Sequence, residues 1–230
     1  MKIWRFTSPR DNKYATAGRR GSWTNGSETG ACPECSSSRQ QRAQPLILVW
    51  EPGSDVVGDF VWPGFGSEVV ATEPVFDALE SRFAGFERGS IEMVEEPDLA
   101  AQGSRPRVSL PYEGPPLYEL WTTAWASADI DRSTVRLDRR CGTCGTEFWE
   151  VDGVEHWDSV FDPGKRQLVR TRVSRDPQFG IYLRGENLAG ADIFRVTQFP
   201  GWVFCTDPVR ELIRERTFTN VDFMEMGEAT

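Results

Sequence analysis

Two stretches of the chain, separated by 134 positions, share one pattern of apolar and polar residues. The first runs from Val69 to Leu79 and the second from Val203 to Ile213, and both contain Thr, an acidic residue, Pro and Val in succession. A short apolar run predicts a buried strand. The threonine then suits the N-cap of a helix, with the acidic residue and the proline in the first turn. Each stretch therefore predicts a strand that leads directly into a helix.

The positions that follow predict two amphipathic helices, with Thr72 and Thr206 as their N-caps. Apolar residues recur three or four positions apart, which places them on one face of a helix. These residues are Val75, Leu79 and Phe83 in the first helix, and Val209, Leu212 and Ile213 in the second. After each helix comes a segment of mixed apolar and acidic residues, 90–94 and 221–226, that predicts a further strand.

Repetition at a fixed spacing indicates a duplicated unit. We therefore expect an α+β fold of two weakly repeated β-rich halves, residues 1–100 and 101–230, each with a Cys-x-x-Cys turn and a strand–helix–strand unit. At 230 residues the chain also suits one compact domain. The polar segment 95–106 is expected to be a linker or surface loop, and residues 14–30 a loop that leads into the first cysteine turn.

Four of the five cysteines form two Cys-x-x-Cys motifs with 105 residues between them. Four thiolates complete a tetrahedral zinc shell and leave no position open for a substrate. In the reducing cytosol such motifs favour metal binding over disulfides. We therefore expect one structural zinc ion that ties two distant parts of the chain together and joins the halves. Its ligands would be Cys32, Cys35, Cys141 and Cys144.

Two other interpretations of the motifs stay open, a site without metal and a pair of redox dithiols. A redox motif normally begins a helix that follows a strand, and neither motif has that sequence context. The fifth cysteine, Cys205, occupies the position of Ala71 in the repeated pattern, inside a predicted core strand. We expect it to be a buried, unreactive thiol.

The charge of the chain argues against a nucleic acid as its partner. There are 26 basic and 35 acidic residues, a net charge of −9. Such a surface is repelled by phosphate backbones. Arg136, Arg139 and Arg140 precede the second motif, where they suit either contact with nucleic acid or compensation of the thiolate charge. The overall charge favours compensation.

Catalysis and membrane insertion find little support in the sequence. The single histidine, His156, stands beside Trp157 and two acidic residues and is expected to be a packed or surface residue. There is no glycine-rich phosphate loop. No apolar stretch approaches the ~20 residues of a membrane span, and the N-terminus lacks the pattern of a secretory signal. We expect a cytoplasmic protein that is not an enzyme.

The two motifs, the second extended as Cys141-Gly142-Thr143-Cys144-Gly145, resemble the double-CXXCG family together with segments 192–196, 203–207 and 221–223. This is a paralogous group abundant in myxobacteria, and some members are immunity proteins against Sit-type toxins delivered by kin cells. The resemblance runs from Lys2 to Glu225. One departure is Ser36, which replaces the glycine of the first CXXCG. The resemblance implies no catalytic residue, and for metal ligation it implies the four cysteines named above.

The leading hypothesis is an immunity protein that binds and blocks one cognate toxin domain, with zinc holding its halves in register. A basic toxin such as a nuclease has a positive substrate site that an acidic surface can occupy. One alternative is a zinc-ribbon regulatory or nucleic-acid-associated module, which needs a basic face near Arg136, Arg139 and Arg140. Another is a thiol oxidoreductase, which needs a thiol of lowered pKa.

Overall fold

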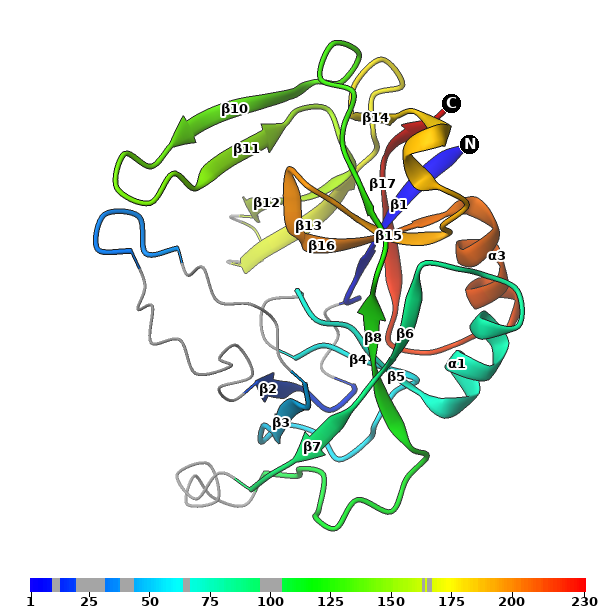
Figure 1. Ribbon diagram of the computed structural model, residues 1–230. Coiled ribbons are helices and arrows are strands. Elements are labelled where there is room, and N and C mark those ends of the chain that lie inside the picture. The colour runs from blue at the N-terminus through cyan, green and yellow to red at the C-terminus, as the bar shows by residue number, and fades with distance from the viewer. Residues whose placement is uncertain are drawn as a thin grey trace.

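The computed structural model describes residues 1–9, 13–19, 32–37, 44–63, 67–95, 105–162, 164 and 167–230 (Figure 1). These residues are mostly β, with two α-helices, α1 (Glu73–Glu80) and α3 (Asp207–Glu215), and one short 3₁₀ helix, η1 (Gly185–Leu188). The α+β class is therefore correct, and strands make up far more of it than helices.

The largest sheet has six strands and contains both chain termini. Met1 donates from its amino group to the carbonyl oxygen of Ala229 at 3.0 Å. Neighbouring strands are antiparallel, except that the outermost strand on each side is parallel to its neighbour. The strand order is β14 (Ile181–Leu183), β17 (Asp222–Ala229), β1 (Lys2–Thr7), β16 (Phe199–Thr206), β15 (Ile193–Val196) and β9 (Trp125–Ala126).

The described residues also form two smaller sheets, one of four strands and one of three. The four-stranded sheet is antiparallel, in the order β4 (Phe60–Val61), β5 (Val70–Thr72), β8 (Leu117–Thr122) and β6 (Phe86–Gly89). The three-stranded sheet has the order β2 (Ala17–Arg19), β3 (Leu46–Trp50) and β7 (Ile91–Met93).

Two separate hairpins complete the fold. The first consists of β10 (Val135–Arg140) and β11 (Glu147–Val151), and its turn carries the second cysteine motif. The second consists of β12 (His156–Asp162) and β13 (Gln167–Val173). In Figure 1 the β10–β11 hairpin reaches away from the six-stranded sheet toward residues 32–37.

Both predicted strand–helix transitions are present. β5 leads directly into α1, and β16 leads directly into α3, each with a proline in the first helical turn. Thr72 and Thr206 are the N-cap residues, as predicted, but neither hydroxyl caps its helix. Both side chains are buried, and the Thr206 hydroxyl bonds to Asp192 Oδ1 at 3.3 Å instead. The helix starts therefore depend on the proline and acidic residue of the first turn rather than on a side-chain cap.

The helices face one shared core, on the same side of the molecule (Figure 1). Cys205 is fully buried within this core, as its position in the pattern predicted. Phe83 lies beyond the end of α1 and still packs against the cluster. The helical residues of the cluster are Val75, Phe76 and Leu79 from α1, and Val209, Leu212 and Ile213 from α3.

The strands around α1 follow the same order and pair in the same register as the strands around α3. We use unit 1 for β4, β5, α1 and β6, and unit 2 for β15, β16, α3 and β17. Unit 1 has the strand order β4-β5-β8-β6, and unit 2 has the order β15-β16-β1-β17. Phe60 pairs with Ala71 in unit 1, and Ile193 pairs with Cys205 in unit 2. A parallel strand also lies at the end of each unit. In unit 2, β14 pairs with β17 itself, and in unit 1, β3 pairs with β7, the strand that comes directly after β6.

The third strand of each unit comes from a distant part of the chain. Strand β1, at the N-terminus, lies between β16 and β17 of unit 2. Strand β8, which precedes the second cysteine motif, lies between β5 and β6 of unit 1. Ile3 pairs with Thr206, and Leu117 occupies the same place opposite Thr72. Each unit is therefore completed by a strand from the other half of the chain.

Hydrogen bonds also join the segment that follows each helix to the other unit. Thr219 follows α3, and its backbone N–H donates to the Asp59 carboxylate, before β4, at 2.7 Å. Ala84 follows α1, and its backbone N–H donates to the Asp192 carboxylate, before β15, at 3.3 Å. The two contacts are reciprocal, so the units hold each other in place through equivalent bonds.

One of the two predicted loops contains a short strand. Residues 17–19, expected to be loop, form β2, because their backbone pairs with β3. The other residues of that loop from 20 onward, and 96–104 of the expected linker, lie outside the described residues.

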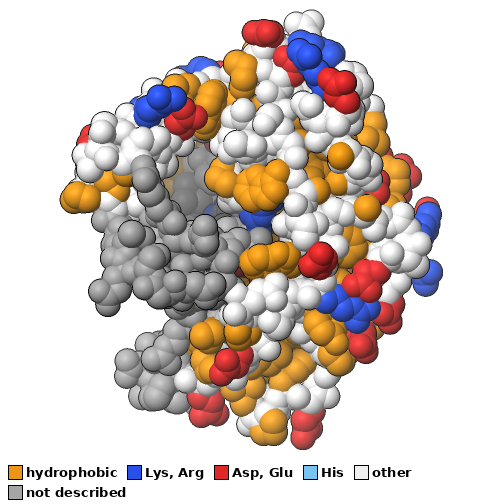
Figure 2. Space-filling view, viewed as in Figure 1, with side chains coloured by type: hydrophobic (Ala, Val, Ile, Leu, Met, Phe, Trp, Pro, Cys, Tyr) orange, Lys and Arg blue, Asp and Glu red, His pale blue; other side chains and the backbone are white. Residues whose placement is uncertain are grey.

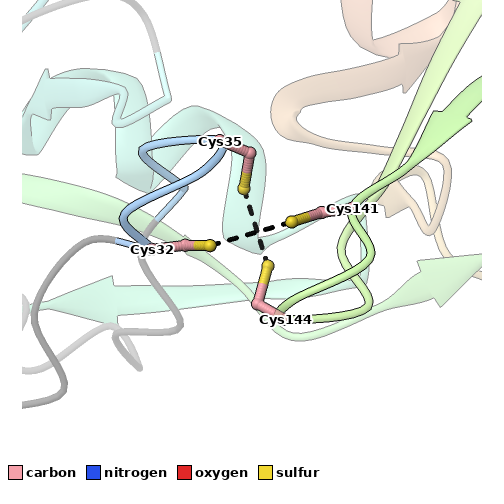
Figure 3. Close-up of side chains that lie close together, drawn as sticks. All are labelled: Cys32, Cys35, Cys141 and Cys144. Carbon is pink, nitrogen blue, oxygen red and sulfur yellow. Dashed lines mark hydrogen bonds between the residues drawn. The ribbon is translucent and has the colours of Figure 1, made fainter.

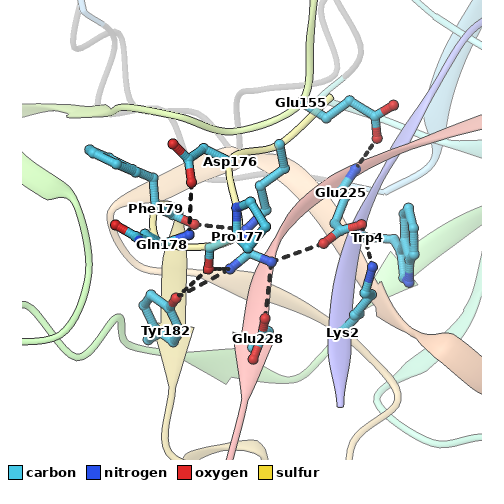
Figure 4. Close-up of polar contacts among 12 residues, drawn as sticks. Lys2, Trp4, Glu155, Asp176, Pro177, Gln178, Phe179, Tyr182, Glu225 and Glu228 are labelled. Carbon is cyan, nitrogen blue, oxygen red and sulfur yellow. Dashed lines mark hydrogen bonds and ion pairs between the residues drawn. The ribbon is translucent and has the colours of Figure 1, made fainter. Parts of the chain in front are cut away.

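Arginines anchor the β12–β13 hairpin on β17. The guanidinium of Arg175, just after β13, contacts Glu225 at 2.9 Å and Glu228 at 3.1 Å, and it donates to the Tyr182 hydroxyl at 3.3 Å (Figure 4). Its side chain is only 2% exposed. Arg172, within β13, pairs with Glu155 and, at 2.9 Å, with Asp222. These contacts fix the base of a hairpin that pairs with no other strand among the described residues.

Candidate metal centre

The four motif cysteines lie together in space, despite the 105 residues between the motifs. Their Sγ atoms all lie within 4.8 Å of one another (Figure 3). Cys32 Sγ is 3.7 Å from Cys141 Sγ, and Cys35 Sγ is 3.5 Å from Cys144 Sγ. Both contacts join a thiol of one motif to the corresponding thiol of the other.

The first cysteine turn, residues 32–37, folds back on itself. Ser36 N–H donates to the Cys32 carbonyl at 2.8 Å, and Cys32 N–H donates to the Ser37 carbonyl at 2.9 Å. Ser36 has a φ of 57°, in the left-handed region that favours glycine. Ser36 therefore adopts a backbone conformation that glycine favours.

The second cysteine turn, residues 141–146, connects β10 and β11 and has the same bonds. Gly145 N–H donates to the Cys141 carbonyl at 2.9 Å, and Cys141 N–H donates to the Thr146 carbonyl at 2.8 Å. Gly145 has a φ of 73°. The two turns thus present their thiols in the same way from opposite sides.

This arrangement fits a tetrahedral metal ion. A Zn–S distance of about 2.3 Å gives sulfur–sulfur separations of about 3.8 Å in a tetrahedron. The measured contacts of 3.7 and 3.5 Å are close to that value. All five cysteines of the chain are free thiols. Cys32 and Cys141 are buried, whereas Cys35 and Cys144 are partly exposed.

Two hydroxyl groups lie within hydrogen-bonding distance of the partly exposed thiols of Cys35 and Cys144. Ser37 Oγ lies 2.7 Å from Cys35 Sγ, and Thr146 Oγ1 lies 3.1 Å from Cys144 Sγ. The Ser37 hydroxyl also donates to the Thr146 hydroxyl at 3.1 Å. We did not predict these residues from the sequence. The available signal was a hydroxyl residue two positions after the second cysteine of both motifs.

Glu34 is a further contact between the turns that sequence reasoning missed. Its carboxylate accepts from the Thr143 backbone N–H at 3.2 Å and from the Thr143 hydroxyl at 2.6 Å. The Cys141 thiol is 3.5 Å away. The Thr143 hydroxyl, followed by the Cys141 thiol, lowers the pKa of Glu34. Its side chain therefore links the turns directly, in addition to any metal.

The thiols differ in proton affinity. The Thr146 hydroxyl and backbone N–H lower the pKa of Cys144 to about 5, and the Ser37 hydroxyl lowers the pKa of Cys35. For Cys141, the Cys144 N–H favours the thiolate, but burial and the neighbouring thiols outweigh it and raise the pKa to about 12. A divalent cation would supply the positive charge that holds all four groups deprotonated.

The remaining sequence candidates lie apart from this chemistry. His156 is exposed on β12, with Nδ1 2.9 Å from the Val154 carbonyl oxygen, as expected of a surface residue. Burial raises the pKa of Cys205 well above its usual value, in keeping with an unreactive core thiol.

The basic residues before the second motif are neutralised within their own hairpin. Arg136 pairs with Glu150, Arg140 with Glu147, and Arg139 lies 4.0 Å from its neighbour Asp138. Their charge is therefore taken up by carboxylates rather than by the thiolates. Among the described residues on the face shown in Figure 2, Lys and Arg side chains lie beside Asp and Glu and form no continuous basic surface.

No family model matches the chain, and no curated protein has a matching sequence. Among the described residues, no helix is long and apolar enough to cross a membrane.

Proposed function

We propose that this chain is a non-enzymatic immunity protein of the cytoplasm that binds and neutralises a cognate toxin domain. The observation that carries the proposal is the cluster of the four motif cysteines, which are the residues on which the resemblance to the double-CXXCG family depends. A shell of four thiolates has no open position for a substrate, so it suits a structural role. The function would then reside in a surface that the cluster holds in shape.

We propose zinc as the ion bound by Cys32, Cys35, Cys141 and Cys144. Support comes from four soft sulfur ligands, sulfur contacts near those of a tetrahedral site, and turns with the tight backbone that such sites use. With the thiols deprotonated, the Thr146 hydroxyl would donate to the Cys144 sulfur. The Ser37 hydroxyl would donate either to the Cys35 sulfur or to Thr146, and Glu34 would hold the turns together.

We also propose that the two halves, 1–100 and 101–230, arose by duplication and that the metal joins them. The equal strand order of units 1 and 2, the matched register and the equivalent cysteine turns support this proposal. The exchange of β1 and β8 gives a reason why the halves remain one compact body rather than two domains.

The partner we propose is a basic toxin domain, such as a nuclease. The net charge of −9 favours association with a positive surface and disfavours competition by nucleic acid. The rival function, a nucleic-acid-associated zinc module, has less support because Arg136 and Arg140 are paired with carboxylates.

Co-expression with the toxin domain encoded by the adjacent gene tests the function. We expect growth to be restored and the two proteins to purify together. Unchanged toxicity without co-purification would refute the proposal. Metal analysis tests the zinc site separately: we expect about one zinc per chain, and a loss of it in the variant with Cys141→Ser and Cys144→Ser. Full metal retention by that variant would refute the shared site.

A further inference from the structure

The cysteine cluster holds an unusual pair of thiols. Cys35 and Cys144 belong to different cysteine turns, yet their Sγ atoms are 3.5 Å apart, and both are partly exposed. Cys32 and Cys141 are buried, 8% and 5% exposed. Solvent-borne reagents therefore reach one thiol of each turn, and these two thiols face each other.

We propose that Cys35 and Cys144 form an oxidation site, at which a peroxide converts the metal-linked cluster into a disulfide between the two cysteine turns. A disulfide within one turn would require a buried thiol, Cys32 or Cys141, to meet the exposed one. A disulfide between the turns requires only that two sulfurs already in contact move closer, from 3.5 Å to about 2 Å.

The reaction balances with hydrogen peroxide as the oxidant. One exposed thiolate attacks a peroxide oxygen, the O–O bond breaks, and a sulfenic acid and, after proton uptake, water are formed. The second thiolate attacks the sulfenic sulfur, the S–S bond forms, and the departing hydroxide takes up a proton to give a second water. Two thiolates thus lose two electrons, and the peroxide gains them.

Oxidation would replace the metal ion with a disulfide as the link between the two halves of the chain. A disulfide lacks the negative charge that makes a thiolate a good ligand, so only Cys32 and Cys141 would remain to hold the ion. Zinc then leaves, while the covalent bond keeps the turns together. The release of zinc rests on the metal site proposed above, whereas the disulfide rests on the geometry of the thiols alone.

The test is to treat the full-length protein with hydrogen peroxide in both zinc-loaded and metal-free forms. Zinc release is followed with a chromogenic chelator, and disulfides are mapped by tryptic digestion and mass spectrometry. Cleavage after Arg20, Arg39, Arg140 and Lys165 places the two motifs on separate peptides, 21–39 and 141–165. A Cys205→Ala background removes the fifth thiol from the map.

We expect the two peptides to appear linked through Cys35 and Cys144, with the loss of two hydrogens per disulfide. In the zinc-loaded form we also expect release of about one zinc per chain. A reductant with added zinc should reverse both changes. The variant with Cys32→Ser and Cys141→Ser should still form the link, whereas Cys35→Ser should not.

Disulfides confined to peptide 21–39 or to peptide 141–165 would overturn the proposal, as would sulfinic acids without any link. If metal analysis shows that the protein binds no zinc and peroxide still gives the linked product, the oxidation site is supported and the proposed metal is refuted. The two ideas can therefore fail separately.

Discussion

The hydroxyls of Ser37 and Thr146 determine the charge of the two exposed thiols. Thr146 lowers the pKa of Cys144 to about 5, and Ser37 lowers that of Cys35. At neutral pH Cys144 binds a metal with little competition from protons, because metal ligation requires the thiolate. Hydroxyl donors therefore contribute to metal affinity without touching the metal.

Replacing Thr146 with valine should weaken zinc binding about tenfold at neutral pH, within the range found for partners of metal ligands. Without the hydroxyl, the pKa of Cys144 rises toward its ordinary value of about 8.5. In the native protein, protonation of Cys144 opposes binding only near and below pH 5. In the variant, protonation opposes binding up to a higher pH. The ratio of native to variant affinity should therefore be largest near and below pH 5, should decrease as the pH rises, and should approach one at about pH 8.5. Competition titrations across pH measure this ratio.

An exposed threonine outside the cluster provides the control. Thr123→Val makes the same chemical change on the surface, and it should leave zinc affinity unchanged at every pH. A Thr146→Val protein whose affinity follows the native curve would show that the hydroxyl has no effect on the site.

Ser36 and Gly145 occupy equivalent positions in the two cysteine turns, both with positive φ. Ser36→Gly should raise the free energy of unfolding by up to about 1 kcal/mol, because a side chain is disfavoured in the left-handed region. Gly145→Ser should lower it by a similar amount. Urea unfolding at a fixed free zinc concentration measures both. Equal stability of the two variants and the native protein would mean that the turns carry no backbone strain.

At this scale the sequence predicted the four thiols and the special position of Ser36. It did not lead us to Glu34, Ser37 or Thr146. The two hydroxyls share their spacing from the preceding cysteine, but that spacing does not show whether a hydroxyl faces a thiol or water. It also led us to pair the arginines before Cys141 with the thiolates, whereas Arg136 and Arg140 pair with glutamates across the β10–β11 hairpin. That pairing depends on strand register, which the sequence does not specify.

The β12–β13 hairpin shows how one element is held by a few charges. Arg175 is almost completely buried and contacts Glu225 and Glu228 of β17. Arg175→Met should lower the free energy of unfolding by about 3 kcal/mol, because, among the described residues, Glu228 loses its partner and Glu225 keeps only Lys2, at 2.7 Å. Urea unfolding provides the measurement.

Arg136→Met is the matched control, since Arg136 pairs with Glu150 and the two side chains are 57% and 48% exposed. It should cost no more than about 1 kcal/mol, as exposed ion pairs do. Comparable losses in the two variants would indicate that burial adds nothing to the Arg175 contacts.

The helices and their preceding strands could be predicted because their residues carry both the apolar period and the first-turn signals. The prediction that the hydroxyls of Thr72 and Thr206 cap the helices was wrong, because both side chains are buried in a packed interior. β2 was also missed, since its three residues, Ala17 to Arg19, form a strand through pairing with β3 rather than through apolar character of their own.

At the scale of the whole molecule, the exchange of β1 and β8 could not be predicted. Both segments have strand-forming composition, but the choice of partner depends on contacts between residues 203 positions apart, as for Ile3 and Thr206. The sequence repeat indicates two similar halves and is equally consistent with two separate domains. The three-dimensional pairing gives each half a sheet that is incomplete without the other.

This exchange predicts that neither half folds alone. A chain divided between residues 100 and 101 should give two polypeptides that are unfolded separately and that assemble when co-expressed, because each supplies the third strand of the other's unit and one cysteine turn. Assembly should fall sharply when Cys141 and Cys144 are replaced with serine, since the turns then lose their shared ion. Co-purification of the two fragments and their far-ultraviolet circular dichroism measure this. If either fragment alone gave a stable, cooperatively unfolding monomer, the exchanged strands would not be essential to the units they complete.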